Sequence, residues 1–308
     1  MRKTSLECVH ELAKIDPSVI FIGSDLGPGV LDNMKLEMPH RFFMEGVSEQ
    51  HIIGMAAGLA MEGYTPYVNT IATFLTRRCF EQIAIDLCLH DLPVRLIANG
   101  GGLVYAPLGP THLATDDIGI LRTLPNMTIV APCDANEMKR LMPKTLDWPH
   151  PIYIRLAKGG DPIVSEPQKG FEIGKAILFG NPIDGLYIST GVMTQRCISA
   201  VKKFSEKGCD VGVLHMHTVK PLDVNALLEH CNPVKKIVTV EEHSKIGGLG
   251  SSVLETLSEN MPQCLPKVTI LGLEDHFAEQ YGSQQTLLDN YGLTLDQIVK
   301  TMNPCCEK

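Results

Sequence analysis

The sequence predicts an α/β protein with two parallel-sheet domains, the first over residues 1–165 and the second over residues 166–308. Short apolar runs alternate with helical patterns, which is typical of a parallel sheet covered by helices. The alternation stops once, in a segment rich in glycine, proline and charge after Arg155, and then restarts. The length of 308 residues also fits two domains of roughly 150 residues each.

The first predicted domain opens with a helical segment, and its candidate strands are short runs of apolar and β-branched residues. Runs that are apolar on both faces are typical of strands buried between two layers of helices. Amphipathic stretches at residues 51–61, 79–89 and 135–146 separate the runs and predict helices. The candidate strands lie at residues 19–22, 67–70, 94–97, 127–130 and 152–154.

The second predicted domain follows a linker at residues 157–170, where glycine, proline and charged residues gather. The same alternation of strand-like and helix-like patterns then resumes, which predicts a second parallel sheet. Its candidate strands lie at residues 185–189, 210–214, 236–240 and 268–271.

Composition excludes several classes of partner. The formal net charge is −8 and no basic stripe occurs, so nucleic acid and anionic membrane surfaces are not expected as partners. The sequence has no run of about 18 apolar residues, so no membrane span is predicted. The first residues also lack the apolar core of a signal peptide. The ten cysteines are scattered without a Cys-x-x-Cys pair, which predicts reduced thiols and no structural zinc. We therefore expect a cytoplasmic protein.

Three segments of the first domain carry a family resemblance. They are residues 45–60, residues 70–83, and Gly-Pro-Thr-His at 109–112 followed by residues 121–127 and 131–134. In this order and spacing they resemble the pyrimidine-binding domain of the thiamine diphosphate-dependent transketolases. Residues 239–243 and 247–250 resemble the C-terminal domain of that family, so the resemblance covers nearly the whole chain. Gly-Gly-Leu-Gly at 247–250 lacks the spacing of a dinucleotide loop and predicts a turn that opens a helix.

Glu49 matches the glutamate that activates thiamine diphosphate in this family. The resemblance implies that its carboxyl group shares a proton with the aminopyrimidine ring, which then acts as the base that generates the carbon nucleophile. Such a role requires a carboxyl group that is partly removed from water. The alternative is a structural one, in which Glu49 favours the dipole at the start of the helix predicted at residues 51–61.

Four further residues are candidates for cofactor binding. Phe74 aligns with the aromatic residue that stacks on the aminopyrimidine, although its type also suits a core position. Ile71 stands where the family often has a second aromatic and offers apolar contact without stacking. Arg78 either lines the pocket or pairs with Glu81. Asp25 lies in an element that is near the cofactor in the family, but it is equally suited to cap a turn.

His112 is the second candidate catalytic residue. In the family this histidine points at the reacting carbons and binds the substrate. An imidazole can donate or accept a proton at ambient pH, which suits carbonyl addition and cleavage. A histidine in a loop is more often merely solvated, and the preceding Gly-Pro-Thr is what favours a functional role here.

Several candidate substrate-binding positions depart from the family pattern. Arg2 matches an arginine that contacts an acceptor phosphate, and Lys158 replaces a second such arginine, which removes the bidentate fork. Leu108 replaces an acidic residue that reads sugar hydroxyls, and the lost hydrogen bond is worth about 1–3 kcal/mol. Gly100 and Gly29 stand where the family has a phosphate-binding histidine and a serine. We therefore expect an altered donor or an acceptor without a standard terminal phosphate.

The sequence contains no Gly-Asp-Gly motif, with which the family binds Mg²⁺ and the diphosphate. The resemblance therefore implies that this chain supplies no metal ligands and that an N-terminal partner subunit carries both groups. It also implies an α2β2 heterotetramer with contact between the two β chains, in which this chain is the C-terminal subunit of a split transketolase. The expected activity is transfer of a two-carbon ketol or acyl unit from a ketose or ketoacid to an aldehyde.

Other interpretations of the same motifs remain open. The β-subunit of a 2-oxoacid dehydrogenase and a 1-deoxyxylulose-5-phosphate-synthase-like subunit share the fold and the glutamate. Residues 121–127 and Gly-Pro-Thr-His favour transketolase over the dehydrogenase. A third interpretation is a non-catalytic assembly partner, against which the retained Glu49 and His112 argue.

Overall fold

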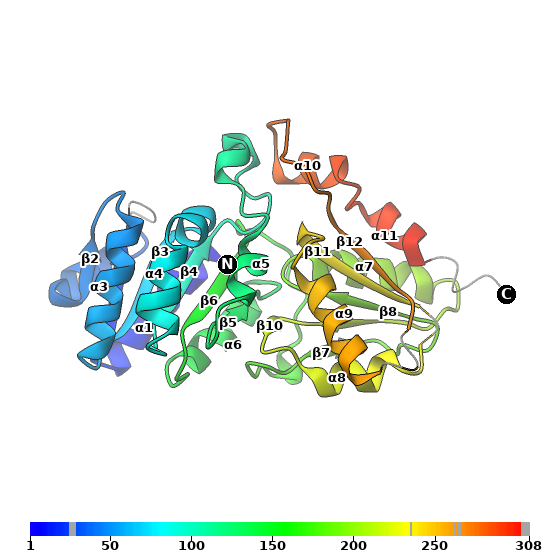
Figure 1. The fold of residues 1–308 in the computed structure, drawn as a ribbon, viewed down its shortest axis with the longest axis horizontal. Helices are drawn as coiled ribbons and strands as arrows, with labels where there is room; N and C mark the ends of the chain where they lie inside the picture. The colour runs from blue at the N-terminus through cyan, green and yellow to red at the C-terminus, as the bar shows by residue number, and fades with distance from the viewer. Residues whose placement is uncertain (25–28, 235, 262, 264–265, 303–308) are drawn as a thin grey trace.

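The computed structural model describes residues 1–24, 29–234, 236–261, 263 and 266–302. It contains two α/β units that lie side by side, each built on one sheet, and the chain begins near the middle of the molecule (Figure 1). The predicted fold class is therefore confirmed, with mostly parallel strands in both sheets. Among the described residues, no helix combines the length and the hydropathy needed to cross a membrane.

The first sheet has seven strands in the order β10-β5-β6-β4-β3-β1-β2. Alternate residues of β1 enter two different cores: Val19 and Phe21 pack with helices α1 and α6, and Ile20 and Ile22 pack with α3. Burial on both faces explains why these strands read as unbroken apolar runs. The strands before the linker are β1 (Val19–Gly23), β2 (Phe42–Met44), β3 (Thr65–Ile71), β4 (Arg95–Asn99), β5 (Thr128–Val130) and β6 (Ile152–Leu156).

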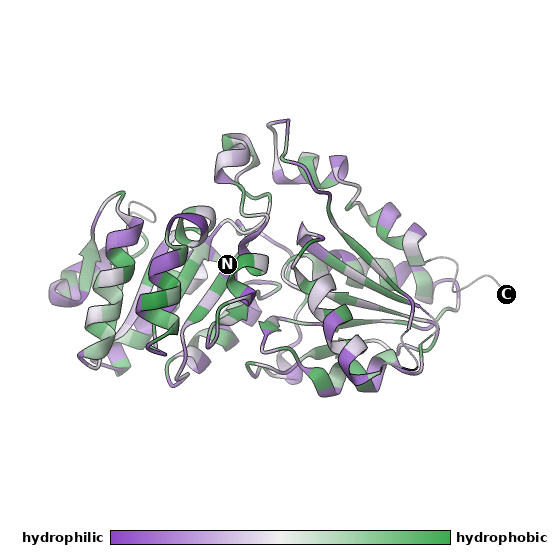
Figure 2. Cartoon of the chain, viewed as in Figure 1, coloured by the Kyte–Doolittle hydropathy of each residue, from purple (hydrophilic) through white to green (hydrophobic). Residues whose placement is uncertain are grey.

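The helices of the first unit cover both faces of its sheet. The predicted helix at residues 79–89 belongs to an irregular helical segment that starts earlier, at Phe74, and includes two π-helical stretches. The helices are α1 (Arg2–Ile15), α2 (Asp32–Glu37), α3 (Glu49–Met61), α4 (Phe80–Gln82), α5 (Asp117–Arg122) and α6 (Ala135–Thr145). Helices that cover the sheets carry both hydrophobic and hydrophilic residues, as Figure 2 shows.

The second sheet has five strands in the order β12-β11-β8-β9-β7. Its strands are β7 (Ile177–Phe179), β8 (Gly185–Ser189), β9 (Val211–His215), β11 (Ile237–Ser244) and β12 (Val268–Leu273). The accompanying helices are α7 (Met193–Ser205), α8 (Val224–Cys231), α9 (Leu249–Asn260), α10 (Gln284–Asn290) and α11 (Leu295–Met302). Residues 247–250 form the predicted turn, because Gly248 caps the start of α9.

Three short strands, β2, β7 and β10 (Thr218–Lys220), were not predicted from the sequence. Each has only three residues, which gives little period-two pattern to recognise; β5 is as short but was found from the strand-like run at residues 127–130. Strand β10 comes from the second half of the chain but pairs antiparallel with β5 in the first sheet. Strand β7 pairs antiparallel with β9 in the second sheet. Both sheets are therefore mixed, whereas the sequence predicted purely parallel sheets.

The two units share an apolar interface. One core cluster includes Ile118 and Leu121 of α5 together with Leu249 and Val253 of α9. The predicted boundary after residue 165 falls between β6 and β7 and stays a prediction. Because β10 also crosses to the first sheet, the units are held together by backbone pairing as well as by apolar contact.

Candidate active site

The candidate site residues gather at one edge of the first sheet, where its parallel strands end. The chain passes from β1 to β2 on one side of β1 and then to β3 on the other, which makes a topological switch point. Ligands of open α/β sheets bind beside such points at the carboxyl ends of the strands. The segments that follow β2, β3, β4 and β6 carry Glu49, Phe74, His112 and Lys158.

Glu49 is the first residue of α3, and its side chain is only 3% exposed. One carboxylate oxygen, Oε2, accepts a hydrogen bond of 2.6 Å from Nη1 of Arg78. Arg78 therefore pairs with Glu49, and its role in a cofactor site stays a prediction. A carboxylate that is removed from water but held by one guanidinium nitrogen keeps its second oxygen available to a ligand.

Phe74 and His112 extend the same group of side chains. The guanidinium carbon of Arg78 lies 4.4 Å from the centre of the Phe74 ring. The imidazole of His112 meets that ring edge to face, with the ring centres 5.1 Å apart. Nδ1 of His112 lies 2.9 Å from the Thr111 hydroxyl oxygen. Residues from three segments thus form one continuous chain of contacts around the carboxyl group of Glu49.

Two candidate cofactor residues remain to be placed. Ile71 ends β3 with 9% of its surface exposed, beside Asn99 of β4. Its position next to the Phe74 segment is consistent with apolar contact to a ligand. Asp25 lies outside the described residues, so its expected role stays a prediction.

The candidate substrate residues come together in a separate cavity of about 200 Å³. Arg2 of α1, Leu108 and Lys158 all line it, although they lie far apart in the sequence. The ring of Tyr105 fills the space that a side chain at Gly100 would need, because an added Cβ would lie 2.2 Å from Cε2 of Tyr105. A side chain at position 100 would therefore clash with Tyr105 in this structure.

Sequence reasoning missed Asn99, which also lines this cavity. Its side chain is 1% exposed, and both its amide oxygen and its amide nitrogen are buried without a hydrogen-bond partner in the described chain. Buried amides are normally paired, so this one is suited to a ligand or a water molecule. The sequence signal that could have identified Asn99 is its position as a polar residue at the end of an apolar strand, where ligands of α/β sheets bind.

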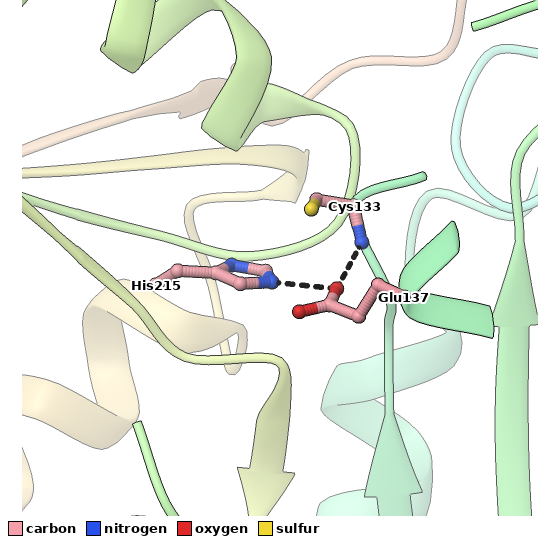
Figure 3. Close-up of side chains that lie close together, drawn as sticks. All are labelled: Cys133, Glu137 and His215. Atoms are coloured by element: carbon pink, nitrogen blue, oxygen red, sulfur yellow. Dashed lines mark hydrogen bonds and ion pairs between the residues drawn. The ribbon is translucent and has the colours of Figure 1, made fainter. Parts of the chain in front are cut away.

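A second cluster joins the two units away from this site. Cys133, Glu137 and His215 are all buried, and their potential ligand atoms lie within 4.8 Å of one another (Figure 3). Oε2 of Glu137 accepts from the Cys133 backbone N–H at 2.6 Å and lies 2.9 Å from Nε2 of His215. Nδ1 of His215 lies 2.7 Å from the Thr194 hydroxyl. Although these residue types can bind a metal, their hydrogen bonds to one another make the cluster a buried cross-link.

Electrostatics supports that interpretation of the cluster. Burial by itself would raise the pKa of Glu137, but the charge and hydrogen bond of His215 outweigh it and lower the pKa to about 2. Burial and the neighbouring carboxylates raise the pKa of the Cys133 thiol well above its ordinary value. The carboxylate is therefore kept ionised and the thiol protonated, which suits a structural ion pair.

Together, the fold and the site define a two-domain α/β protein that presents a buried acid, an aromatic ring and a histidine at the carboxyl edge of its first sheet. Comparison with known families specifies the class. Residues 1–160 match the transketolase pyrimidine-binding domain and residues 184–298 match the transketolase C-terminal domain. The chain belongs to the transketolase family, as its sequence motifs predicted.

Individual relatives cover nearly the whole chain. An apulose-4-phosphate transketolase subunit of Phocaeicola vulgatus is 36% identical over 97% of this chain and 95% of its own length. The 6-deoxy-6-sulfo-D-fructose transketolase subunit of a Clostridium species is 31% identical over 100% of this chain and 95% of its own. The 1-deoxy-D-xylulose-5-phosphate synthase of Gloeobacter violaceus is 35% identical over 95% of this chain, but only 46% of that protein is matched.

A solved structure gives the same result for the fold. The structure described as a split gene transketolase, inactive beta4 tetramer, superposes with a TM-score of 0.90 at 34% identity. It covers 99% of this chain and 97% of its own. These relatives support a transferase-type enzyme subunit of the transketolase family.

Proposed function

We propose that this chain is the C-terminal subunit of a thiamine diphosphate-dependent transketolase, active together with an N-terminal partner subunit. It would transfer a two-carbon ketol or acyl unit from a ketose or ketoacid donor to an aldehyde acceptor. The observation that carries this proposal is the continuous group of Glu49, Arg78, Phe74 and His112 at the switch point of the first sheet.

The residues at the site suit thiamine diphosphate. When bound, this cofactor supplies a carbon nucleophile that adds to a ketone and accepts the electron pair of the adjacent C–C bond. A buried carboxyl group suits a ring nitrogen that must share a proton, and the face of Phe74 suits a flat heterocycle.

Each side chain then has a defined task. The Glu49 carboxylate would accept a hydrogen bond from the ring nitrogen of the cofactor, and Arg78 fixes the orientation of that carboxylate. Phe74 provides the stacking surface. His112 moves a proton to or from the substrate oxygen through Nε2, while Thr111 fixes its ring by the contact at Nδ1. Arg2 and Lys158 attract an anionic group of the substrate.

The assembly that we propose is an α2β2 heterotetramer with contact between the β chains. The names of two relatives describe them as transketolase subunits, and the solved relative is described as a split gene transketolase and an inactive tetramer of β chains. If the cofactor site is shared between two chain types, an assembly of only one type is expected to be inactive. The partner is expected to be a chain of roughly 250–300 residues with a Gly-Asp-Gly motif and the Mg²⁺ site.

The test is reconstitution with the product of the neighbouring reading frame that carries that motif. Neither chain alone should bind thiamine diphosphate tightly, and the mixture should be active with Mg²⁺. Glu49→Gln should reduce turnover at least about 100-fold while size-exclusion chromatography still shows the complex. An active complex with the Glu49→Gln subunit would refute the proposed role, and a complex that binds no thiamine diphosphate would refute the function.

We further propose a specialised substrate pair. Leu108 is half exposed in the cavity where the family reads sugar hydroxyls, and Tyr105 closes the place of a phosphate-binding histidine. Two relatives carry the names of unusual ketoses, apulose 4-phosphate and a sulfofructose, which fits this departure. Full activity with xylulose 5-phosphate and ribose 5-phosphate would contradict it.

A 1-deoxyxylulose-5-phosphate-synthase-like activity is the second candidate, since such synthases are relatives at 35% identity. Decarboxylation of pyruvate by the reconstituted complex would favour this activity, or that of a 2-oxoacid dehydrogenase subunit, over the proposed transketolase activity.

A further inference from the structure

The loop of residues 102–114 carries both Leu108 and His112, and its two ends are tied together. The Gly102 N–H donates to the Ala114 carbonyl at 2.9 Å, and the Ala114 N–H donates to the Gly102 carbonyl at 3.0 Å. Between these ends, two short 3₁₀ turns cover residues 106–108 and 110–112. The loop rises beyond the sheets at the top of Figure 1, next to the segment that leads into α10.

A carboxylate of the second unit binds the base of this loop. Glu242 of β11 is 2% exposed, and its Oε1 accepts from the Leu103 backbone N–H at 2.8 Å. The approach is close, because a Cβ added at Gly102 would lie 2.5 Å from Cδ of Glu242. Gly102 also has φ of +66°, a left-handed conformation that glycine adopts most readily. The backbone at Gly102 is thus shaped to fit this carboxylate.

The same carboxylate also holds the segment that touches the tip of the loop. The side-chain amide of Gln284, the first residue of α10, donates to Oε1 of Glu242 at 2.8 Å and to Oε2 at 3.1 Å. Three residues earlier, Tyr281 packs against Gly109, where an added Cβ would lie 2.5 Å from Cε1 of the ring. The second unit therefore contacts the loop at two places, and Glu242 connects both.

The position of Glu242 is itself fixed from the first unit. Nη2 of Arg155 donates to the Glu242 carbonyl at 2.9 Å and to the Ala114 carbonyl at 3.0 Å. Arg155 in turn is paired with buried Asp117 at 2.7 Å. The bonds of Arg155 to Ala114 and Asp117 lie within the first unit, whereas its bond to the Glu242 carbonyl crosses to the second. Arg155 therefore joins the base of the loop to the backbone of Glu242.

We infer that Glu242 is a positioning residue that sets the loop of residues 102–114 over the active site and thereby determines substrate binding. The inference that this loop binds substrate rests on the proposed function. The inference that Glu242 positions the loop does not depend on that function. The second unit thus takes part in the site through this carboxylate, although Glu242 itself contacts neither Glu49 nor His112 in the structure.

The first test uses the full chain alone and measures hydrogen–deuterium exchange. Glu242→Ala should raise exchange in peptides covering residues 103–113 by about tenfold, because the Leu103 N–H loses its acceptor. Glu242→Gln keeps one acceptor oxygen and should restore much of the protection. Tyr281→Ala, at a side chain that is 66% exposed, should loosen residues 106–112 without affecting folding.

Glu241 provides a matched control, because it is equally buried on the same strand but accepts from Leu249 and Gly250 at 2.6 and 2.7 Å. Glu241→Gln should loosen the start of α9 and leave the loop protected. Unchanged exchange of residues 103–113 in folded Glu242→Ala would overturn the inference, as would an equal effect of Glu241→Gln. If Glu242→Ala does not fold, hydrogen–deuterium exchange of Glu242→Gln and Tyr281→Ala is compared with that of the wild type. Exchange in residues 103–113 that is unchanged in both variants would then overturn the inference.

The second test uses the complex reconstituted with the partner subunit. Glu242→Ala should raise KM for the fastest ketose of a donor screen about tenfold and Glu242→Gln should raise it less, with the affinity for thiamine diphosphate unchanged in both. An unchanged KM in an active complex would contradict the positioning role alone. A wild-type complex that is inactive with every donor would instead contradict the proposed function, and the exchange result would still decide the role of Glu242.

Discussion

Replacement of Glu137 by glutamine should destabilise the folded chain through the buried cluster that joins the two units. Glutamine has the shape of the protonated acid and still accepts from the Cys133 N–H, but it loses the charge that faces His215 at 2.9 Å. The pKa of Glu137 falls from its ordinary 4.5 to about 2 in the folded chain. At about 1.4 kcal/mol per pKa unit, the ionised form contributes about 3 kcal/mol to the free energy of unfolding. Loss of one partner of a buried ion pair costs a similar 3–5 kcal/mol or so.

Urea unfolding provides the assay, followed by the fluorescence of Trp148, the single tryptophan, and by circular dichroism. A loss of about 3 kcal/mol should lower the midpoint by about 1 M at pH 7. Because the carboxyl pKa is lowered on folding, this stabilisation is fully present above pH 4.5 and disappears as the pH falls toward 2. The gap between wild type and variant should therefore narrow on acidification.

The control is Glu255→Gln, which breaks another ion pair between the units, with Arg122. The Glu255 side chain is 60% exposed, so the midpoint should change by less than the equivalent of about 1 kcal/mol. A similar small change in Glu137→Gln, or a gap that is as wide at pH 3 as at pH 7, would refute the electrostatic argument.

Three further predictions concern the site. Glu49→Gln should reduce turnover of the reconstituted complex at least 100-fold or so, measured with saturating thiamine diphosphate, and a smaller loss would exclude proton sharing by Glu49. Leu108→Asp should raise kcat/KM for polyol donors by about 5- to 150-fold, through one restored hydrogen bond of about 1–3 kcal/mol, and a donor screen checks this. Gly102→Ala should impair the loop, because it combines a φ of +66° with a Cβ 2.5 Å from Glu242; the measurement is hydrogen–deuterium exchange of residues 103–113, and unaltered exchange would count against the close fit.

The family and the positions of most strands along the chain could be predicted because their signals are local. Each long strand is an apolar run that needs no knowledge of its neighbours, and each motif follows such a run directly. Glu49, Phe74 and His112 were therefore found as candidates before any contact was known. Their proximity in the structure follows from the parallel sheet, which brings the ends of its strands to one edge.

Short elements and long-range pairs could not be predicted in this way. Strands of three residues, such as β10, form because a partner strand is already present, and β10 finds that partner in the other unit. The choice of Glu49 over Glu81 as the partner of Arg78 likewise depends on the packing of α3 against the segment after β3.

The sequence by itself determined the family, the two α/β units and the candidate site residues, since these depend on apolar periodicity and on contiguous motifs. Only the tertiary structure decided which charges meet: Glu137 with His215 across 78 positions, and Glu242 with the Leu103 N–H across 139. The physical reason is that a buried charge must find a partner in space, and nothing in its sequence neighbourhood specifies which distant group will be there.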